Sequence, residues 1–259
     1  MNSLSVVGGA LCYEFRMQLR RRAVWIVVAA LSLPFILLLV VPAKGLDQSS
    51  VQTQLVVQWA QILALFLPIG VGLLLADRLP RDRRTRVEEV LDTVPGGVGA
   101  RLAGKYLGST LATLAPVFLG YAGGTDYILT QVQSLHPLPA ALAAFAAIVL
   151  PALLFVAAFS VACPVVLKVP LYQFLLTGYW LWANLLSPKI HLPTLTFTLL
   201  NAAGPWASEG FFHVHWFFFP PRVHVAVWQA VANIALLLAL GTAVLVAAWG
   251  YLGWRQARR

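Results

Sequence analysis

The chain of 259 residues is poor in charge, and the charge it has is unevenly distributed. Only 10% of its residues are charged whereas 60% are hydrophobic, and nine acidic residues stand against 18 lysines and arginines. The charges gather in blocks between long uncharged runs, a pattern that excludes an ordinary soluble fold and places the chain in a bilayer. Membrane topology and attraction to anionic inner-leaflet lipid explain the net charge of +9, so nucleic-acid binding is not indicated.

Cysteine is scarce as well. Cys12 and Cys163 are the only two, and both map to the expected cytosolic side or its membrane edge, where thiols stay reduced. The sequence therefore predicts neither a disulfide nor a metal-binding pair of thiols.

The long apolar runs predict an all-α integral membrane protein in which residues 1–259 form one transmembrane domain. Six runs approach the roughly 20 residues that a helix needs to cross the hydrocarbon. They lie near residues 23–41, 55–76, 106–124, 138–162, 170–187 and 224–252. Four prolines fall inside these spans, where neighbouring helices can satisfy the freed carbonyls, and each is a candidate kink: Pro34, Pro68, Pro116 and Pro151.

The distribution of lysine and arginine predicts the orientation. With the N-terminus inside, all of these residues except Lys44, Lys189 and Arg222 fall on the cytosolic side. The positive-inside rule therefore favours an even number of spans with both termini in the cytosol.

Residues 5–22 have the pattern of an amphipathic helix that lies in the inner interface before the first span. Its apolar face consists of Val7, Leu11, Phe15 and Leu19, and its polar residues are Glu14, Arg16, Gln18 and Arg20. A compatible reading is that the basic residues simply anchor the topology. Five residues are predicted to anchor the chain at the inner interface, partly by snorkelling to the headgroups: Arg20, Arg21, Arg22, Arg101 and Lys105.

A charged loop at 77–105 separates the second and third spans. Thr85 and Glu88 have the spacing of a capping box, so a helix should begin near Arg86. Val87, Val90, Leu91 and Val94 recur at helical spacing and form an apolar stripe. Pro95 and the glycines after it end the helix.

The order of motifs in this loop resembles that of the permease subunits of type-2 ABC exporters. In that family an acidic helix is followed by Thr-x-Pro, a variable turn and Gly-Lys-Tyr, and here these elements fall at 88–91, 93–95 and 104–106. The resemblance implies a short cytosolic coupling helix that docks on a separate ATPase subunit. The residues it would use are Val87, Glu88, Glu89, Val90, Leu91, Val94 and Pro95. The alternative is a helix that rests on the lipid headgroups.

The same resemblance implies a six-span permease with an N-terminal elbow helix in the cell membrane. It would pair with a second copy or a sister permease and export its cargo. It would carry no cofactor and would not be an enzyme by itself, because ATP and Mg²⁺ would bind to the partner subunit. The run from Gly99 to Tyr106 imitates a phosphate-binding loop, but tyrosine stands where a Ser or Thr hydroxyl would hold magnesium and no strand precedes it.

Two other classes are opposed by what the spans lack. No Asp, Glu, Lys, Arg or His lies well inside any of them, whereas an ion-coupled carrier or channel normally needs such groups. No HExxH or GxSxG motif supports a membrane enzyme, which leaves a non-transporting membrane factor as a further alternative. Neutral polar residues remain to line a path or, as the favoured reading, to join helices by hydrogen bonds. The path-lining candidates are Gln58, Gln61, Thr110, Thr113, Gln173, Thr177, Asn184 and Asn233.

The loop at 188–223 is expected on the outer side, where it is aromatic and almost uncharged. All five histidines map to this side, and His213 and His215 are weak metal candidates because the diagnostic spacings of metal sites are absent. The resemblance implies short re-entrant or interfacial helices here, and lipid anchoring by a belt of Trp and Phe is the alternative.

Overall fold

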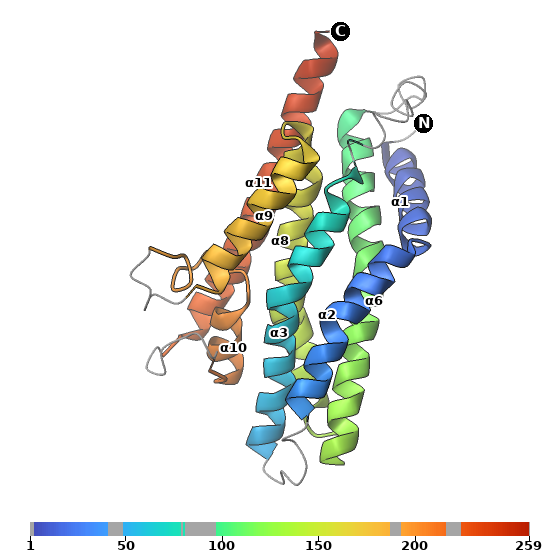
Figure 1. The fold of residues 1–259 in the computed structure, drawn as a ribbon. Coiled ribbons are helices and arrows are strands. Elements are labelled where there is room, and N and C mark those ends of the chain that lie inside the picture. Colours follow the sequence, from blue (N-terminus) through green and yellow to red (C-terminus); the bar gives the residue numbers. More distant parts are fainter. Residues whose placement is uncertain are drawn as a thin grey trace.

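The structure is a computed structural model that describes residues 3–40, 49–78, 80, 97–186, 193–215 and 224–258. Every regular element among these residues is a helix and none is a strand, which confirms the all-α prediction for them. Most of the helices lie side by side in one elongated bundle (Figure 1).

The chain begins with α1 (Ser3–Leu19), which turns at residues 20 and 21 into α2 (Arg22–Val40). After α3 (Ser49–Leu75) and α6 (Val98–Val132) comes one continuous stretch made of α7 (Leu138–Ala144), the π-helical segment η1 (Phe145–Val149), α8 (Leu150–Ala162) and the 3₁₀ turn η2 (Cys163–Val165). The last elements are α9 (Val169–Asn184), the short α10 (Pro205–Phe212) and α11 (Val227–Ala257).

Four stretches of the described residues are long and apolar enough to cross a bilayer: Ser50–Leu75, Val98–Val132, Leu138–Val165 and Val227–Ala257. They make this a transmembrane protein and agree with four of the six predicted spans. The other two predicted spans coincide with α2 and α9. α2 has 19 residues, close to the roughly 20 that a perpendicular crossing needs, whereas α9 has 16 and falls short of that length.

The helix that contains the third predicted span is longer than that span. Its 35 residues from Val98 to Val132 extend about 52 Å at 1.5 Å per residue, against the predicted 106–124. Residues 98–105, assigned to the cytosolic loop from the sequence, are the first turns of α6. The helix continues beyond the apolar run because α1 packs along its first turns (Figure 1).

The core is built around α3. Trp59 and Trp180 are completely buried, and their indole N–H groups donate to the carbonyls of Tyr121 (3.1 Å) and Leu65 (2.6 Å). The Leu65 carbonyl lies in the turn before Pro68, where a proline weakens the helical hydrogen bonds, and the Trp180 indole adds a donor from a neighbouring helix. These two tryptophans therefore join α3 to α6 and α9.

Pro151 has a visible effect on the helix that contains it. It cannot donate a backbone hydrogen bond, and the turn before it widens into η1, in which the Leu150 N–H donates to the carbonyl of Phe145, five residues back. Ile148 of this segment faces Gly204, whose φ of 85° lies in the left-handed region. A Cβ at Gly204 would collide with Ile148, so the turn into α10 fits against the π-helical break only with glycine there.

Candidate functional site

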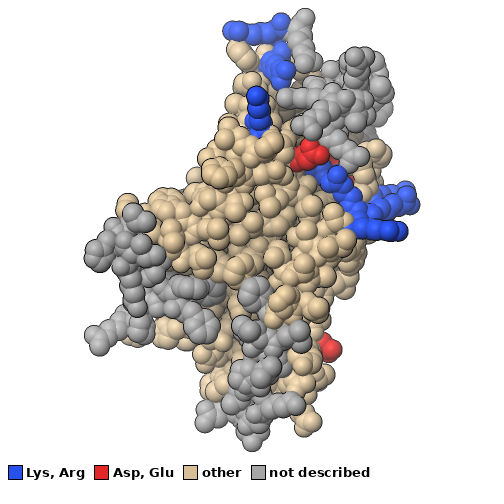
Figure 2. Space-filling view, in the orientation of Figure 1, with Lys and Arg blue, Asp and Glu red and all other residues tan. Residues whose placement is uncertain are grey.

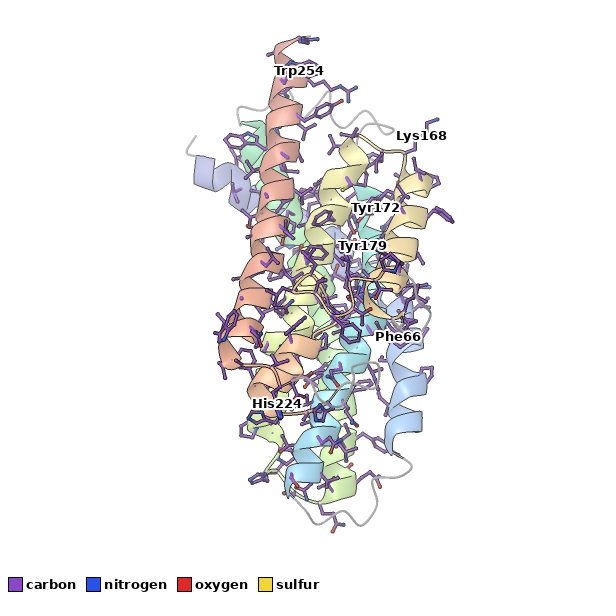
Figure 3. All side chains as sticks on the ribbon, turned by 90° about the vertical axis from the view of Figure 1, so that its left-hand side faces the viewer. Phe66, Lys168, Tyr172, Tyr179, His224 and Trp254 are labelled. Atoms are coloured by element: carbon purple, nitrogen blue, oxygen red, sulfur yellow. The ribbon has the colours of Figure 1, made fainter. Side chains whose placement is uncertain are left out.

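Positive charge is concentrated at one end of the bundle, which we call the basic end (Figure 2). The elements that meet there are α1, the last turn of α3, the first turns of α6, the turn before α9 and the last turns of α11 (Figure 1). Figure 3 shows Lys168 and Trp254 toward this end and His224 toward the opposite one. The guanidinium of Arg258 lies 4.0 Å from the centre of the Trp254 ring.

A buried charge cluster joins three of these elements. The Glu14 cluster consists of Glu14 on α1, Arg78 just after α3 and Lys105 on α6. Glu14 Oε1 lies 3.0 Å from Lys105 Nζ, and Glu14 Oε2 lies 3.7 Å from Arg78 Nη1. All three side chains are less than a tenth exposed. Charges this deeply buried require partners, because desolvation makes an unpaired one costly.

Two glycines allow α1 to come this close to α6. A Cβ at Gly104 would lie 2.7 Å from Ala10 Cβ, and one at Gly108 would lie 2.6 Å from the Leu11 carbonyl oxygen. We call Gly104 and Gly108 the glycine notch. Small residues spaced by four let helix backbones approach each other, as in membrane helix pairs. The Gly-Lys-Tyr motif seen in the sequence is thus the surface on which α1 docks.

Gln18 lies one turn beyond Glu14 on α1 and is completely buried. Neither its amide nitrogen nor its carbonyl oxygen has a hydrogen-bond partner within the described part of the chain. A buried amide without partners destabilises the fold, so this polar region is only partly satisfied.

Lys105 was predicted from the sequence as an interface anchor, but its partner Glu14 was not. The sequence pattern placed Glu14 and Gln18 on the exposed polar side of α1, whereas both are buried. The signal was available, because the two are four residues apart and flank the apolar face on the side of Leu11. Of the other predicted anchors, Arg20 and Arg22 are exposed and Arg21 and Arg101 are half-buried.

The predicted coupling residues lie outside the described residues. These are Val87, Glu88, Glu89, Val90, Leu91, Val94 and Pro95. Arg78 and Lys105 flank that connection on either side, so the Glu14 carboxylate is in contact with both of its ends.

A second polar region lies toward the opposite end of the bundle. Residues 193–215, here the folded-back segment, turn back against α3, η1 and α11, and residues 201–210 are all buried. A helix in the outer loop was implied by the family resemblance, and α10 occupies that position. The folded-back segment can be buried because three asparagines bond to its backbone.

The three asparagines supply hydrogen bonds to the backbone of this segment. Asn184 Oδ1 accepts from the N–H groups of Ala202 (2.9 Å) and Ala203 (3.2 Å). Asn233 Nδ2 donates to the carbonyls of Leu199 and Asn201, at 2.8 and 3.0 Å. Asn201 Nδ2 donates to the Thr196 carbonyl, and Asn201 Oδ1 accepts from the Ala203 N–H. Neutral side chains therefore replace water for an irregular backbone, as burial requires.

The predicted path-lining residues divide into several groups. Asn184 and Asn233 hold the folded-back segment, and Gln61 Nε2 donates to the Ser208 hydroxyl on α10. Gln173 Nε2 donates to the Leu73 carbonyl at 3.0 Å, and thus ties α9 to α3. Thr113 and Thr177 donate to carbonyls four residues back in their own helices. Gln58 is half-buried on α3. The bonds of Gln61 and Gln173 join two helices, as favoured from the sequence, whereas Asn184 and Asn233 bond to irregular backbone instead.

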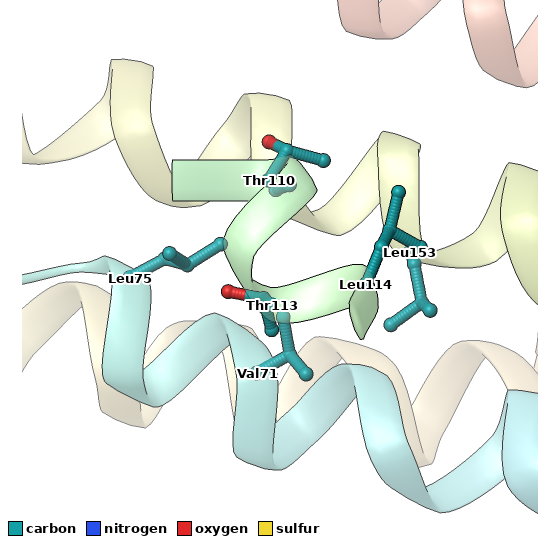
Figure 4. Close-up of a pocket in the computed structure, with 7 residues that line it drawn as sticks. Val71, Leu75, Thr110, Thr113, Leu114 and Leu153 are labelled. Atoms are coloured by element: carbon teal, nitrogen blue, oxygen red, sulfur yellow. The ribbon is translucent and has the colours of Figure 1, made fainter. Parts of the chain in front are cut away.

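Thr110 and Thr113 border a small cavity between α3, α6 and α8 (Figure 4). It has room for about one water molecule. Its other lining residues are Val71, Leu75, Leu114, Leu153 and Ala157. The buried Thr110 hydroxyl has no hydrogen-bond partner in the described structure. The cavity is too small for a transported molecule.

His213 and His215 lie at the end of α10. His215 Nδ1 lies 2.9 Å from Glu209 Oε2, and Glu209 is buried in α10. His213 ends α10 with a φ of 54°, and its side chain is exposed. In the described ranges no three His, Cys, Asp or Glu side chains are placed to share a metal ion. The arrangement is a close contact between His215 and Glu209 at the end of α10.

Compared with known proteins, the chain matches no protein-family model and no curated protein.

Proposed function

We propose that this chain is the membrane-spanning permease subunit of an ATP-driven exporter of the type-2 ABC class. A separate subunit binds ATP and Mg²⁺ and hydrolyses the nucleotide. Two permease chains, identical or sisters, enclose the path in the cell membrane. The observation that carries the proposal is the role of the Gly-Lys-Tyr motif: its glycine notch receives α1, and its lysine pairs with Glu14.

That geometry fits a coupling loop. The connection between α3 and α6 contains the acidic-helix and Thr-x-Pro pattern, and both of its ends contact a carboxylate on the N-terminal helix. A force applied to this connection would therefore reach α1, α3 and α6 together. In the proposed arrangement the 85–95 helix receives that force from the ATPase subunit.

The proposed topology has six spans, with α2 and α9 as the two shorter ones and α1 as the elbow helix. Exposed Trp228 and Trp249 on α11 are 21 residues apart, about 31 Å along a helix, which matches a hydrocarbon core of about 30 Å between two aromatic belts. The basic end faces the cytosol under the positive-inside rule, with both termini on that side.

An ion-coupled carrier or channel is the runner-up. It would need an ionisable group along the middle of the bundle. In the part of the chain that the structure describes, the buried ionisable acids and bases are Glu14, Arg78, Lys105 and Glu209. The first three belong to the basic end and Glu209 to the folded-back segment, so the position of these charges favours an externally driven transporter.

The test is a pull-down of the tagged, detergent-solubilised protein followed by mass spectrometry. We expect an ATPase subunit to be recovered with the wild-type chain and lost with Val90→Glu/Leu91→Glu, because charge on the apolar stripe would prevent docking. Val166→Glu is the matched control, since Val166 is 69% exposed in the turn before α9 and lies outside the predicted coupling helix. Recovery of no ATPase with the wild type under conditions that preserve other membrane complexes would overturn the proposal.

A further inference from the structure

The Glu14 cluster has a geometry that neither a topology anchor nor a coupling helix requires. One carboxylate divides its two oxygens between two cations that are far apart along the chain. Oε1 takes Lys105 and Oε2 takes Arg78, and residues 79–104 connect the two. The Glu14 carboxylate therefore bridges the two residues that flank that connection.

The pairing is made in a dry environment. The side chains of Arg78, Glu14 and Lys105 are 1%, 6% and 9% exposed. Removing one partner from a buried ion pair leaves the other charge uncompensated, which weakens the whole contact rather than one bond. By contrast, Arg16 on the same helix and Arg20 in the turn after it are exposed.

The glycine notch and the charges act on the same contact. Leu11 and Glu14 of α1 both approach Gly108, and Lys105 lies between the two notch glycines in sequence. The notch supplies close backbone approach but no directional bond, whereas the ion pairs fix which residues of α1 stand beside which residues of α6.

We propose that Glu14 is a positioning residue that fastens α1 to both ends of the 79–104 connection, so that α1, the end of α3 and the first turns of α6 move as one body. This body moves relative to α8 and α9, which contribute no member to the cluster. The inference does not depend on the identity of the partner that the connection binds, and it therefore stands apart from the proposed permease function.

The test measures distances between spin labels in the full-length protein in lipid nanodiscs, diluted with excess unlabelled protein. One pair joins the native, exposed Cys12 on α1 to Ala103→Cys on α6. The reference pair joins Ala103→Cys to Lys168→Cys before α9. Cys163→Ser removes the second native thiol, and Cys12→Ser removes the first for the reference pair. Ala103 and Lys168 are both exposed, so the labels disturb no packing.

With Glu14 intact we expect a narrow distribution for the pair from residue 12 to residue 103. Glu14→Gln should abolish that narrow distribution and leave the reference pair unchanged. Arg16→Gln, which removes an exposed charge from the same helix, should change neither pair. The swap Glu14→Lys/Lys105→Glu/Arg78→Glu, which reverses all three charges of the cluster, should restore the narrow distribution, because it restores both paired contacts with opposite sign.

Three results would overturn the proposal. An unchanged distribution in Glu14→Gln would mean that the glycine notch alone holds α1. Broadening of both pairs together would make Glu14 a general determinant of stability. Failure of the charge swap while single variants remain folded would show that the contact is not electrostatic.

Discussion

The two polar regions of this bundle each hold a buried segment in place with polar side chains, but the chemistry of these side chains differs. At the basic end, the Glu14 cluster holds a helix against a helix with full charges, and a neighbouring amide, Gln18, has no hydrogen-bond partner among the described residues. Toward the opposite end, neutral asparagines hold an irregular segment and their bonds lie between 2.8 and 3.2 Å. A fully satisfied network rigidifies the segment that it holds, whereas a buried polar group without a partner costs stability.

The comparison indicates that the folded-back segment is held more rigidly than the basic end. The folded-back segment has its backbone satisfied by side chains from α9, α11 and the segment itself, so its movement would require breaking several buried bonds at once. The Glu14 cluster holds its second cation at 3.7 Å, beyond hydrogen-bonding distance. In the proposed permease, the basic end is the end that receives the motion.

The largest expected effect comes from removing an asparagine of the neutral network. Asn184→Leu leaves the buried Ala202 N–H without its acceptor and should lower the free energy of unfolding by about 2–3 kcal/mol. Thermal unfolding of the purified protein in detergent measures this. The control is Thr177→Val on the same helix, whose hydroxyl donates to the Gln173 carbonyl one turn back in that helix and whose loss should cost less. Equal destabilisation by the two variants would contradict the assignment.

A second prediction concerns the glycine notch. Gly108→Ala would place a Cβ 2.6 Å from a backbone oxygen of α1 and 2.9 Å from Glu14 Cβ, so α1 must shift, at a cost of about 1–3 kcal/mol. Gly123→Ala is the control on the same helix, because a Cβ there meets nothing within 4 Å. That substitution should instead stabilise α6 by about 0.5–1 kcal/mol. Thermal unfolding of both variants shows whether each substitution raises or lowers the free energy of unfolding. Destabilisation by both would show that the notch has no special role.

The sequence predicted the positions of the spans better than their limits or their contacts. Hydrophobic run length located the centre of α6, but it could not show that the helix starts at Val98, because that extension depends on α1 packing into the notch. Hydrogen bonding by Asn184 and Asn233 was favoured from their polarity inside apolar helices. Their partners in the folded-back segment could not be identified, since an aromatic, uncharged loop is equally typical of a lipid-facing belt.

Glu14 shows why the site itself was harder to predict. A carboxylate on an amphipathic helix is normally assigned to the solvated face, and here the buried stripe passes through Glu14 and Gln18. Only the fold brings Arg78 and Lys105, one on each side of a connection, to the same carboxylate. The coupling stripe from Val87 to Val94 lies outside the described residues and stays a prediction.

The smallest expected effects come from replacing one buried glutamine by leucine at each end of the bundle. Because the substitution is the same, the two ends can be compared directly. Gln18→Leu removes a buried amide that has no partner in the described structure, so it should be neutral or raise the free energy of unfolding by about 1 kcal/mol. Gln61→Leu removes the donor to the Ser208 hydroxyl and should lower it by about 1 kcal/mol. Thermal unfolding of both variants in the same detergent shows whether each one raises or lowers the free energy of unfolding. Destabilisation by Gln18→Leu as large as that by Gln61→Leu would show that Gln18 has a partner, and the basic end would then be as completely bonded as the opposite one.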